Sequence, residues 1–473
     1  VIEQARESAG PWAETPIRAR LERLRRFRHL LADRVDELTA VAAAESGKPP
    51  VDVINEVFQS CNLIRWLEKS AARVLRGRGV SAWPLVHKRA RIEMRPVGVV
   101  LAITPWNYPV CLAIGPCVQA LAAGNAVILK PSELAGEAAA AIAKLWRETG
   151  DDAVWQTALG GPETARGLAS GAVDKIVFTG GAEGGKAIMR AAAERLTPVV
   201  LELGGSDAAI VAADADLDRA APGIAWGSFY NAGQSCIAVR RVFAVAPIYD
   251  RFCEKLREAV GAIRTSAAAG ENGFDIGPVR TDRQVERLRE QVADALGKGA
   301  TLLCGEAAIP SGERRVGPIV LAGVDDSMRV AREECFGPIL AVRKVTTEAE
   351  AIAAANGTPL GLGASVWSAD GSRRRELAAR IESGSVAIND CLVQFAAPAL
   401  PFGGVKGSGF GRQHGEFGLL EFAAPKATIE HRFGPRREMQ WFPARGKDRM
   451  FRRFLKLLHA GSWGERIKAL FGR

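Results

Sequence analysis

Short aliphatic runs alternate with alanine-rich segments from residue 97 onward, and this alternation limits the chain to few folds. The runs lie at 97–103, 126–129, 154–159, 175–178 and 199–203. The segments between them, at 110–123, 135–148, 163–170 and 186–195, have the length and composition of helices. Strands that alternate with helices at this spacing form a parallel sheet with helices on both faces. Such a sheet binds ligands where its strands end.

The same alternation restarts after residue 206 and predicts a second α/β domain. Its strands are expected at 208–211, 241–244, 300–303, 339–345, 365–367 and 385–388, and its first helices at 216–231 and 249–263. Residues 13–77 have apolar positions at helical period, so we expect amphipathic helices packed outside a core. Residues 80–96 predict an extended arm, and the glycine-rich residues 399–412 predict a loop.

The net charge of +10 is concentrated at the end of the chain. Residues 432–473 hold 12 Lys and Arg against 3 Asp and Glu, so the rest of the chain is nearly neutral. Apolar residues recur at helical spacing over 447–458 and again over 463–471, between basic residues. A basic amphipathic helix of this kind suits an anionic membrane surface, but packing on the chain's own body or on a partner subunit needs the same apolar stripe. The tail carries no aromatic and basic platform typical of nucleic-acid binding, so we expect no nucleic acid as partner.

The cysteines and histidines indicate which cellular compartment and which metal sites to expect. The eight cysteines form no Cys-x-x-Cys pair and no regular spacing, which favours a reducing, cytoplasmic compartment without a disulfide framework. The five histidines form no pair at helical spacing, so we expect no metal. No apolar run reaches the 18 residues that would indicate a membrane-spanning helix.

A carboxylate and a thiol stand out among the strand ends. Glu202 ends an apolar run before Gly204 and Gly205, and Cys236 follows the predicted helix 216–231. The two groups are a candidate base and a candidate nucleophile, provided that the carboxyl is partly desolvated and the thiol lies where the thiolate is favoured. Either residue alone is more often a solvated carboxylate or an inert buried thiol.

Other strand ends carry further polar groups. Asn107 follows the first strand, where its amide would suit a developing oxyanion or would cap the helix 110–123. Lys130 and Glu133 follow the second strand, either as ribose contacts or as an exposed pair at a helix start. The run 178–186 is rich in glycine; it has the spacing of a P-loop, but Ala187 replaces the hydroxyl residue, so nucleotide hydrolysis is not expected. A turn that only packs a helix on a strand is the alternative.

Seven motifs, in order, resemble the NAD(P)-dependent aldehyde dehydrogenase superfamily. They are Thr-Pro-Trp-Asn-Tyr-Pro, Leu-Lys-Pro-Ser-Glu, Phe-Thr-Gly-Gly, Leu-Glu-Leu-Gly-Gly, Gly-Gln-Ser-Cys, Glu-Glu-Cys-Phe-Gly-Pro and Leu-Pro-Phe-Gly-Gly. The resemblance as a whole covers roughly residues 10–430. The spacing and the segment 387–390 look most like the class 3 branch, which handles aromatic and medium to long aliphatic aldehydes.

The resemblance implies a role for each matching residue. Cys236 would attack the aldehyde, Asn107 and the Cys236 N–H would hold the oxyanion, and Glu202 would activate the water that hydrolyses the thioester. NAD, with NADP as the alternative, would be held by a larger set: Ile103, Thr104, Trp106, Lys130, Glu133, Gly161, Gly180, Gly181, Gly185, Leu203, Glu334 and Phe336. Tyr108, Trp226 and Phe229 would line the substrate tunnel, although each also suits a core.

One departure from the family concerns the phosphate side of the cofactor. The superfamily usually has Ser where this chain has Gly181, so one hydroxyl contact is lost, at a cost of about 1 kcal/mol. Glu133 would repel a 2′-phosphate by its charge, which favours NAD.

The resemblance also implies a domain plan and a function. Residues 1–79 and 97–203 would form a Rossmann-like cofactor domain, 204–408 a catalytic domain, 80–96 and 409–431 a bridging arm that makes a homodimer, and 432–473 the basic tail. The chain would oxidise an apolar aldehyde to its acid in the cytoplasm. Independently of the resemblance, the basic amphipathic pattern makes residues 447–471 a candidate contact with a membrane surface. The alternative is a catalytically inactive protein of the same fold that binds membranes peripherally.

Overall fold

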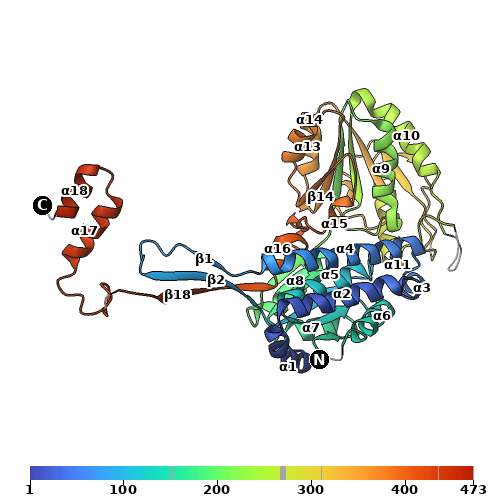
Figure 1. The fold of residues 1–473 in the computed structure, drawn as a ribbon. Coiled ribbons are helices and arrows are strands. Elements are labelled where there is room, and N and C mark those ends of the chain that lie inside the picture. Colours follow the sequence, from blue (N-terminus) through green and yellow to red (C-terminus); the bar gives the residue numbers. More distant parts are fainter. Residues whose placement is uncertain (151–152, 267–272, 311, 435, 472–473) are drawn as a thin grey trace. The chain divides into compact units, whose positions relative to one another are not determined.

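The computed structural model describes residues 1–473 except 151–152, 267–272, 311, 435 and 472–473. These residues divide into two compact units: residues 1–76 with 94–426, and residues 77–93 with 427–473 (Figure 1). The predicted α/β class is confirmed, because the larger unit contains two mainly parallel sheets covered by helices.

The first sheet has six strands in the order β17-β7-β6-β3-β4-β5. Its parallel strands are β3 (Val99–Thr104), β4 (Ala126–Pro131), β5 (Trp155–Thr157), β6 (Lys175–Thr179) and β7 (Val199–Glu202), and β17 (Gly409–Phe410) pairs antiparallel with β7. Strands β3 and β4 are buried along their whole length, because helices cover both faces.

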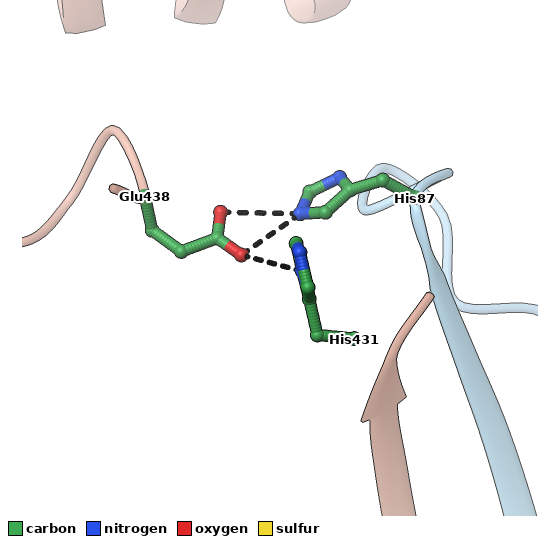
Figure 2. A group of neighbouring side chains, drawn as sticks. All are labelled: His87, His431 and Glu438. Atoms are coloured by element: carbon green, nitrogen blue, oxygen red, sulfur yellow. Dashed lines mark hydrogen bonds and ion pairs between the residues drawn. The ribbon is translucent and has the colours of Figure 1, made fainter. Parts of the chain in front are cut away.

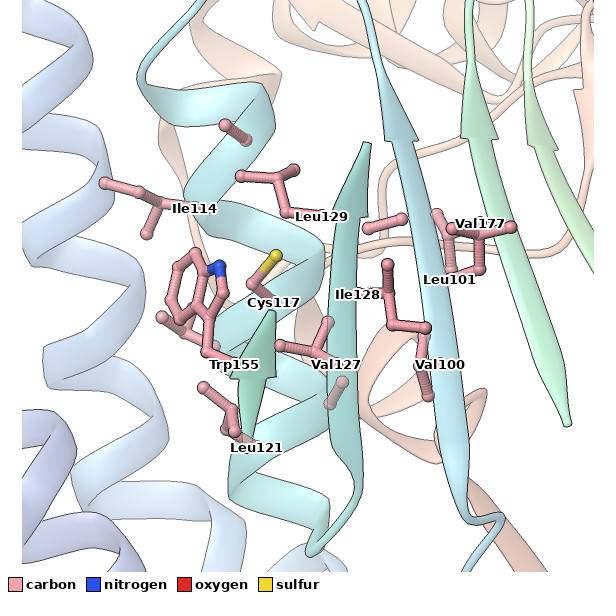
Figure 3. Packing of buried hydrophobic residues seen from close by; sticks show 14 of the residues in the cluster. Val100, Leu101, Ile114, Cys117, Leu121, Val127, Ile128, Leu129, Trp155 and Val177 are labelled. Carbon is pink, nitrogen blue, oxygen red and sulfur yellow. The ribbon is translucent and has the colours of Figure 1, made fainter. Parts of the chain in front are cut away.

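Helices between these strands fill the first hydrophobic core. They are α5 (Cys111–Ala123), α6 (Gly136–Arg147), α7 (Pro162–Ala169) and α8 (Ala182–Ala193). Figure 3 shows α5 beside β4, with Cys117 on the side of the helix that faces strand residues such as Val127 and Leu129, and with Ile114 on the side away from the strands. Every residue of α5 is buried, which explains its almost uniformly apolar sequence.

Four helices precede this sheet; three of them lie within residues 13–77, where amphipathic helices are expected, and the first lies almost entirely before that range. They are α1 (Ile2–Glu14), α2 (Ile17–Asp33), α3 (Val35–Ser46) and α4 (Pro50–Val74). Helix α4 packs between α2 and α5 and contributes Leu63, Ile64 and Leu67 to the first core (Figure 1).

The second sheet has seven strands in the order β10-β11-β12-β9-β8-β14-β15. They are β8 (Asp207–Val211), β9 (Val239–Val245), β10 (Thr301–Cys304), β11 (Ile319–Ala322), β12 (Ile339–Val345), β14 (Gly363–Trp367) and β15 (Ser385–Ile388), and β10 alone runs antiparallel to its neighbour. Its helices are α9 (Leu217–Phe229), α10 (Tyr249–Gly261), α11 (Asp282–Gly297), α12 (Arg329–Arg332), α13 (Glu348–Asn356), α14 (Gly371–Ala379) and α15 (Val393–Ala396), with the 3₁₀ turns η1 (Tyr230–Gly233) and η2 (Ala246–Ile248).

Two local expectations were wrong. Residues 399–412 are not only a loop, because β16 (Val405–Lys406) pairs with β13 (Leu360–Gly361) and β17 pairs with β7. Helix α8 begins at Ala182 rather than at residue 186, so the glycine-rich run continues into its first turn.

Helix α16 (Gly415–Leu420) follows β17 in the chain, and Leu419 and Phe422 are buried in the first core.

The smaller unit contains two helices and most of a three-stranded sheet, of which residues 94–96 and 423–426 belong to the larger unit. The strands are β1 (Arg78–Val80), β2 (Lys88–Pro96) and β18 (Ala423–His431), in the order β1-β2-β18, and the helices are α17 (Asp448–His459) and α18 (Trp463–Phe471). The extended segment and the two tail helices that the sequence predicts are therefore present. Among the described residues, none of the helices is both long enough and apolar enough to cross a bilayer.

Candidate active site

One large cavity of about 1080 Å³ collects most of the residues singled out in the sequence. Cys236, Glu202 and Asn107 all line it. The cofactor candidates that line it are Ile103, Thr104, Trp106, Lys130, Glu133, Gly180, Gly181, Leu203, Glu334 and Phe336. The cavity therefore lies at the carboxyl ends of the strands of the first sheet, which is the edge where a parallel α/β sheet binds its ligands.

Glu202 is the last residue of β7, where Thr179 on one side and Gly409 on the other pair with it. Its side chain is 3% exposed, and neither carboxylate oxygen has a hydrogen-bond partner within the described part of the chain. Burial raises the pKa of Glu202 well above its ordinary value, although Arg412 opposes the rise. The carboxyl is therefore a proton acceptor with a raised affinity for its proton.

Cys236 follows a sharply folded turn. Asn231, Ala232 and Gly233 all have positive φ, and a Cβ on Gly233 would lie 2.3 Å from the carbonyl oxygen of Gly337. The buried guanidinium of Arg240 donates to the carbonyls of both Gly233 and Gly337 and so fixes the turn. This strain is of the kind that concentrates at functional sites.

The surroundings of Cys236 do not favour the thiolate, contrary to the requirement stated from the sequence. Burial raises the pKa of the thiol, and the negative charges of Asp207, Glu202 and Glu334 raise it further. In this structure the group is therefore a thiol, and attack on a carbonyl requires that its proton be removed.

Hydrogen bonds to the backbone carbonyl and from the side-chain amide fix the position of Asn107. Its carbonyl accepts from Lys48 Nζ at 3.0 Å and from Asn231 Nδ2 at 2.9 Å, while its Nδ2 donates to the Gln234 carbonyl at 2.9 Å. The helix-capping alternative is excluded, because α5 has Val110 at its N-cap and no side-chain cap bond. The second N–H of the amide is available for an oxyanion.

A buried ion pair supports the Asn107 turn from behind. Lys48 Nζ and Glu56 Oε1 are 2.5 Å apart and both side chains are almost fully buried. Glu56 Oε2 also accepts from the backbone N–H of Val110 at 2.9 Å. Neither Lys48 nor Glu56 was singled out in the sequence, since Gly47-Lys48-Pro49 predicts only a break between helices.

The cofactor candidates form a cradle around the first sheet. A Cβ on Gly180 or Gly184 would lie within 3 Å of the Phe178 ring, so the turn passes closely over that ring. The rings of Trp106 and Phe336 meet edge to face with centroids 5.9 Å apart. Thr104 Oγ1 is buried and has no hydrogen-bond partner among the described residues. Buried polar atoms are usually hydrogen-bonded, so this hydroxyl is a candidate contact for a bound ligand.

Three candidates lie outside the cavity lining. Gly161 is the N-cap of α7, and its neighbour Pro162 lines the cavity instead. Gly185 lies inside α8, where a Cβ would come within 2.7 Å of Leu203. Phe229 is 1% exposed in the core of the second sheet. It is the last residue of α9, and it faces the core while Trp226, three residues earlier, faces the cavity.

Aromatic and aliphatic side chains form a wall around Cys236, and only some of them could be recognised in the sequence. Cys236, Leu392 and Phe395 pack against a small cluster of Ile237, Leu362 and Phe402. Tyr108 stacks on Tyr230, and Trp226 lies against Tyr230 with centroids 5.3 Å apart. The missed members come from α4, α15 and the loop 399–404: Phe58, Leu392, Val393, Phe395 and Phe402. Each belongs to an otherwise ordinary helix or loop pattern, so no local signal distinguishes it.

Comparisons with known proteins find related sequences and structures. The profile described as the aldehyde dehydrogenase family matches residues 1–428. The 4,4′-diapolycopene aldehyde oxidase of a Methylomonas species is 38% identical over 93% of this chain and 83% of its own. The succinate-semialdehyde dehydrogenase [NADP(+)] GabD of Escherichia coli strain K12 is 34% identical over 89% of this chain and 87% of its own. The crystal structure of a Mycobacterium tuberculosis aldehyde dehydrogenase complexed with NAD+ superposes with a TM-score of 0.86, at 33% identity, over 92% of this chain and 90% of that one.

Proposed function

The chain belongs to the aldehyde dehydrogenase family and oxidises aldehydes to acids with NAD or NADP; from that premise we propose that its substrate is a long apolar aldehyde and that Cys236, Glu202 and Asn107 carry the reaction. The single observation that carries the proposal is the common cavity, in which these three side chains meet the aromatic wall.

In the first half of the reaction, the Cys236 thiol gives its proton to a water molecule as Sγ bonds to the aldehyde carbon. The carbonyl oxygen becomes an oxyanion held by the Asn107 amide and the Cys236 backbone N–H. Bound NAD(P)+, held by the cofactor residues described below, would supply the hydride acceptor. Collapse of the oxyanion releases hydride from the carbon and leaves a thioester on Cys236.

In the second half, Glu202 takes a proton from water as its oxygen attacks the thioester carbon. The C–S bond breaks, the acid leaves and Cys236 regains a proton. The two unpartnered oxygens of Glu202 support this role, because a buried carboxyl with no protein partner is free to receive a proton from a water.

The cradle described above supports cofactor binding by this chain. Lys130 is the next-to-last residue of β4 and Glu133 follows that strand, where the two would hold a ribose, and the N-terminus of α8 beyond Gly180 would face the phosphates. Glu334 approaches Gly204 so closely that a Cβ there would lie 2.3 Å from its carboxylate. Glu334 and Phe336 would meet the second ribose and the nicotinamide ring.

The wall around Cys236 supports an apolar substrate. The elements that form it, α4, α5, α9 and α15, contribute no Lys or Arg to the cavity lining. A semialdehyde that carries a carboxylate would need such a cation, because an unpaired buried charge is costly. The relative named 4,4′-diapolycopene aldehyde oxidase acts, by that name, on an apocarotenoid aldehyde, which agrees better with this wall than the semialdehyde relatives do.

An aldehyde panel with both cofactors tests the proposal. Aromatic and long aliphatic aldehydes should give the highest kcat/KM, succinate semialdehyde the lowest, and Cys236→Ala should abolish NAD(P)H formation with every aldehyde. A preference for succinate semialdehyde over all apolar aldehydes would refute the apolar substrate and leave the membership of the family untouched.

We also propose that the chain is a cytoplasmic homodimer whose tail touches the membrane surface. Eight of the nine residues of β18 are exposed and lie on the edge of the small sheet, which is an open template for pairing with a second copy. Sedimentation of the full chain should give twice the mass of 50.4 kDa. A monomer at all concentrations would exclude the dimer.

A further inference from the structure

Two histidines and a glutamate from distant parts of the sequence meet in the smaller unit (Figure 2). His87 Nε2 lies 3.1 Å from both carboxylate oxygens of Glu438, and His431 Nδ1 lies 3.3 Å from Glu438 Oε1. The three candidate ligand atoms all lie within 4.8 Å of one another. The expectation of no metal considered only pairs at helical spacing, and these side chains come from separate segments.

The distances suit a small cation. With zinc bonds of about 2.0–2.1 Å and tetrahedral angles, neighbouring ligand atoms lie about 3.3 Å apart. The two pairs that involve Glu438 already have this separation, so an ion needs only small rotations of the rings. Two imidazoles and one carboxylate form a three-ligand set that zinc accepts with water in the fourth position.

A backbone hydrogen bond joins the two segments that carry the histidines. The N–H of Arg432, next to His431, donates to the His87 carbonyl at 3.1 Å, which joins the end of β18 to the segment before β2. The Cβ position of Gly434 lies 3.6 Å from atoms of both rings, and its φ of +126° favours glycine. Glu438 is 6% exposed, so its carboxylate is largely withdrawn from water.

A competing explanation is that the cluster is only a network of ion pairs. Lys88 Nζ donates to Glu438 Oε1 at 2.6 Å, so one ammonium already balances the one carboxylate. Because Lys88 already balances the charge of Glu438, an ion pair does not require either imidazole, yet both imidazoles point at this carboxylate. Lys88 occupies Oε1, the oxygen nearest His431, so a cation would bind Oε2, which lies 3.1 Å from His87 Nε2, and the His431 ring would turn from Oε1 toward that cation. A hydrogen-bonded second oxygen is common in carboxylates that bind metals.

We propose that His87, His431 and Glu438 form a zinc site that fastens the segment before α17 to the β1-β2 hairpin. The site is separate from the proposed chemistry, because none of its residues lines the catalytic cavity. Its effect is to fix the start of the tail rather than to take part in aldehyde oxidation.

Zinc titration of the full chain tests the site. Calorimetry is done on the Cys236→Ala protein, so that the thiol in the cavity cannot bind the added metal. We expect stoichiometric binding that falls by more than the roughly 10–100-fold typical for loss of an outer-shell partner in each of His87→Ala, His431→Ala and Glu438→Gln. His459→Ala, an exposed histidine of the same tail, is the matched control and should bind as the parent does.

Cobalt and hydrogen exchange give readouts that activity does not. Co²⁺ should give a tetrahedral visible spectrum without sulfur-to-metal charge transfer, and zinc should slow exchange at the Arg432 amide in the parent and not in Glu438→Gln. Absence of stoichiometric binding, or binding that survives all three substitutions, would overturn the proposal. A cobalt spectrum with thiolate bands would do the same, since it would place the metal on cysteine.

Discussion

Glu202 is buried more completely than a base in contact with bulk water would be, and this has a kinetic consequence. If it activates the deacylating water, Glu202→Gln keeps the shape of the site and removes only the proton acceptor. We expect a burst of NAD(P)H of up to one equivalent per active site and a steady rate lower by about 10²–10⁴-fold, which is the usual contribution of a general base. Stopped-flow and steady-state absorbance on the same sample separate the two phases.

The pH profile is the control for this assignment. Because burial raises the pKa of Glu202, the carboxyl is protonated at low pH and becomes a base only as pH rises. The steady rate of the parent should therefore increase with pH. The burst should also become faster with pH in both proteins, because the pKa of Cys236 is raised as well. A steady rate in Glu202→Gln equal to that of the parent would show that another group activates the water.

Gly181 tests the one departure from the family pattern. Its Cβ position has no atom within 4 Å, and its extended φ and ψ at the N-cap of α8 suit serine. We expect Gly181→Ser to lower the KM for NAD by about fivefold, which corresponds to the roughly 1 kcal/mol of one hydrogen bond. Gly184→Ser is the contrasting variant, because its Cβ would lie 2.9 Å from the Phe178 ring and should weaken binding. An unchanged KM in Gly181→Ser would mean that position 181 does not face the phosphates.

At the scale of elements, α9 separates substrate contact from packing. Trp226 faces the cavity and is 44% exposed, whereas Phe229 is 1% exposed in the second core. Trp226→Ala should lower kcat/KM for long aldehydes more than for propanal and leave the melting temperature nearly unchanged. Phe229→Ala should instead cost about 3–5 kcal/mol of stability and keep the ratio of the two rates. Chemical denaturation with the same aldehyde pair distinguishes these results, and equal losses for both aldehydes in Trp226→Ala would remove it from the substrate wall.

Some of these elements could be predicted from the sequence and others could not. Strands such as β3 and β4 are apolar at every position because both faces are covered, so they could be found from the sequence. The two-residue strands β16 and β17 have no periodicity and exist only because partners lie beside them. Whether Trp226 or Phe229 faces the cavity depends on the rotation of α9, and both have the same apolar character. His87 and Glu438 are 351 residues apart, so only the folded chain brings them together.

At the scale of the whole molecule, the tail is the part that the family match leaves out, since that match ends at residue 428. Helix α17 has no buried residue, and Phe454, Leu455, Trp463 and Leu470 each expose 45% or more of their surface. Basic residues lie between them, so an apolar stripe and positive charge occur together on α17 and α18. That combination favours binding to the surface of an anionic bilayer.

Vesicle co-sedimentation of the full chain tests this last prediction. We expect binding to vesicles that contain phosphatidylserine, weaker binding to neutral vesicles, and loss of binding in high salt, because each surface-bound Lys or Arg contributes about 1 kcal/mol. Phe454→Asp with Leu455→Asp should abolish binding and leave propanal oxidation unchanged, because neither residue lines the cavity. The matched control, Phe417→Asp, changes an exposed apolar residue outside the tail and should bind as the parent does. If the double variant binds vesicles like the parent, the apolar stripe packs on protein instead, and the rate with long aldehydes should then be independent of added vesicles.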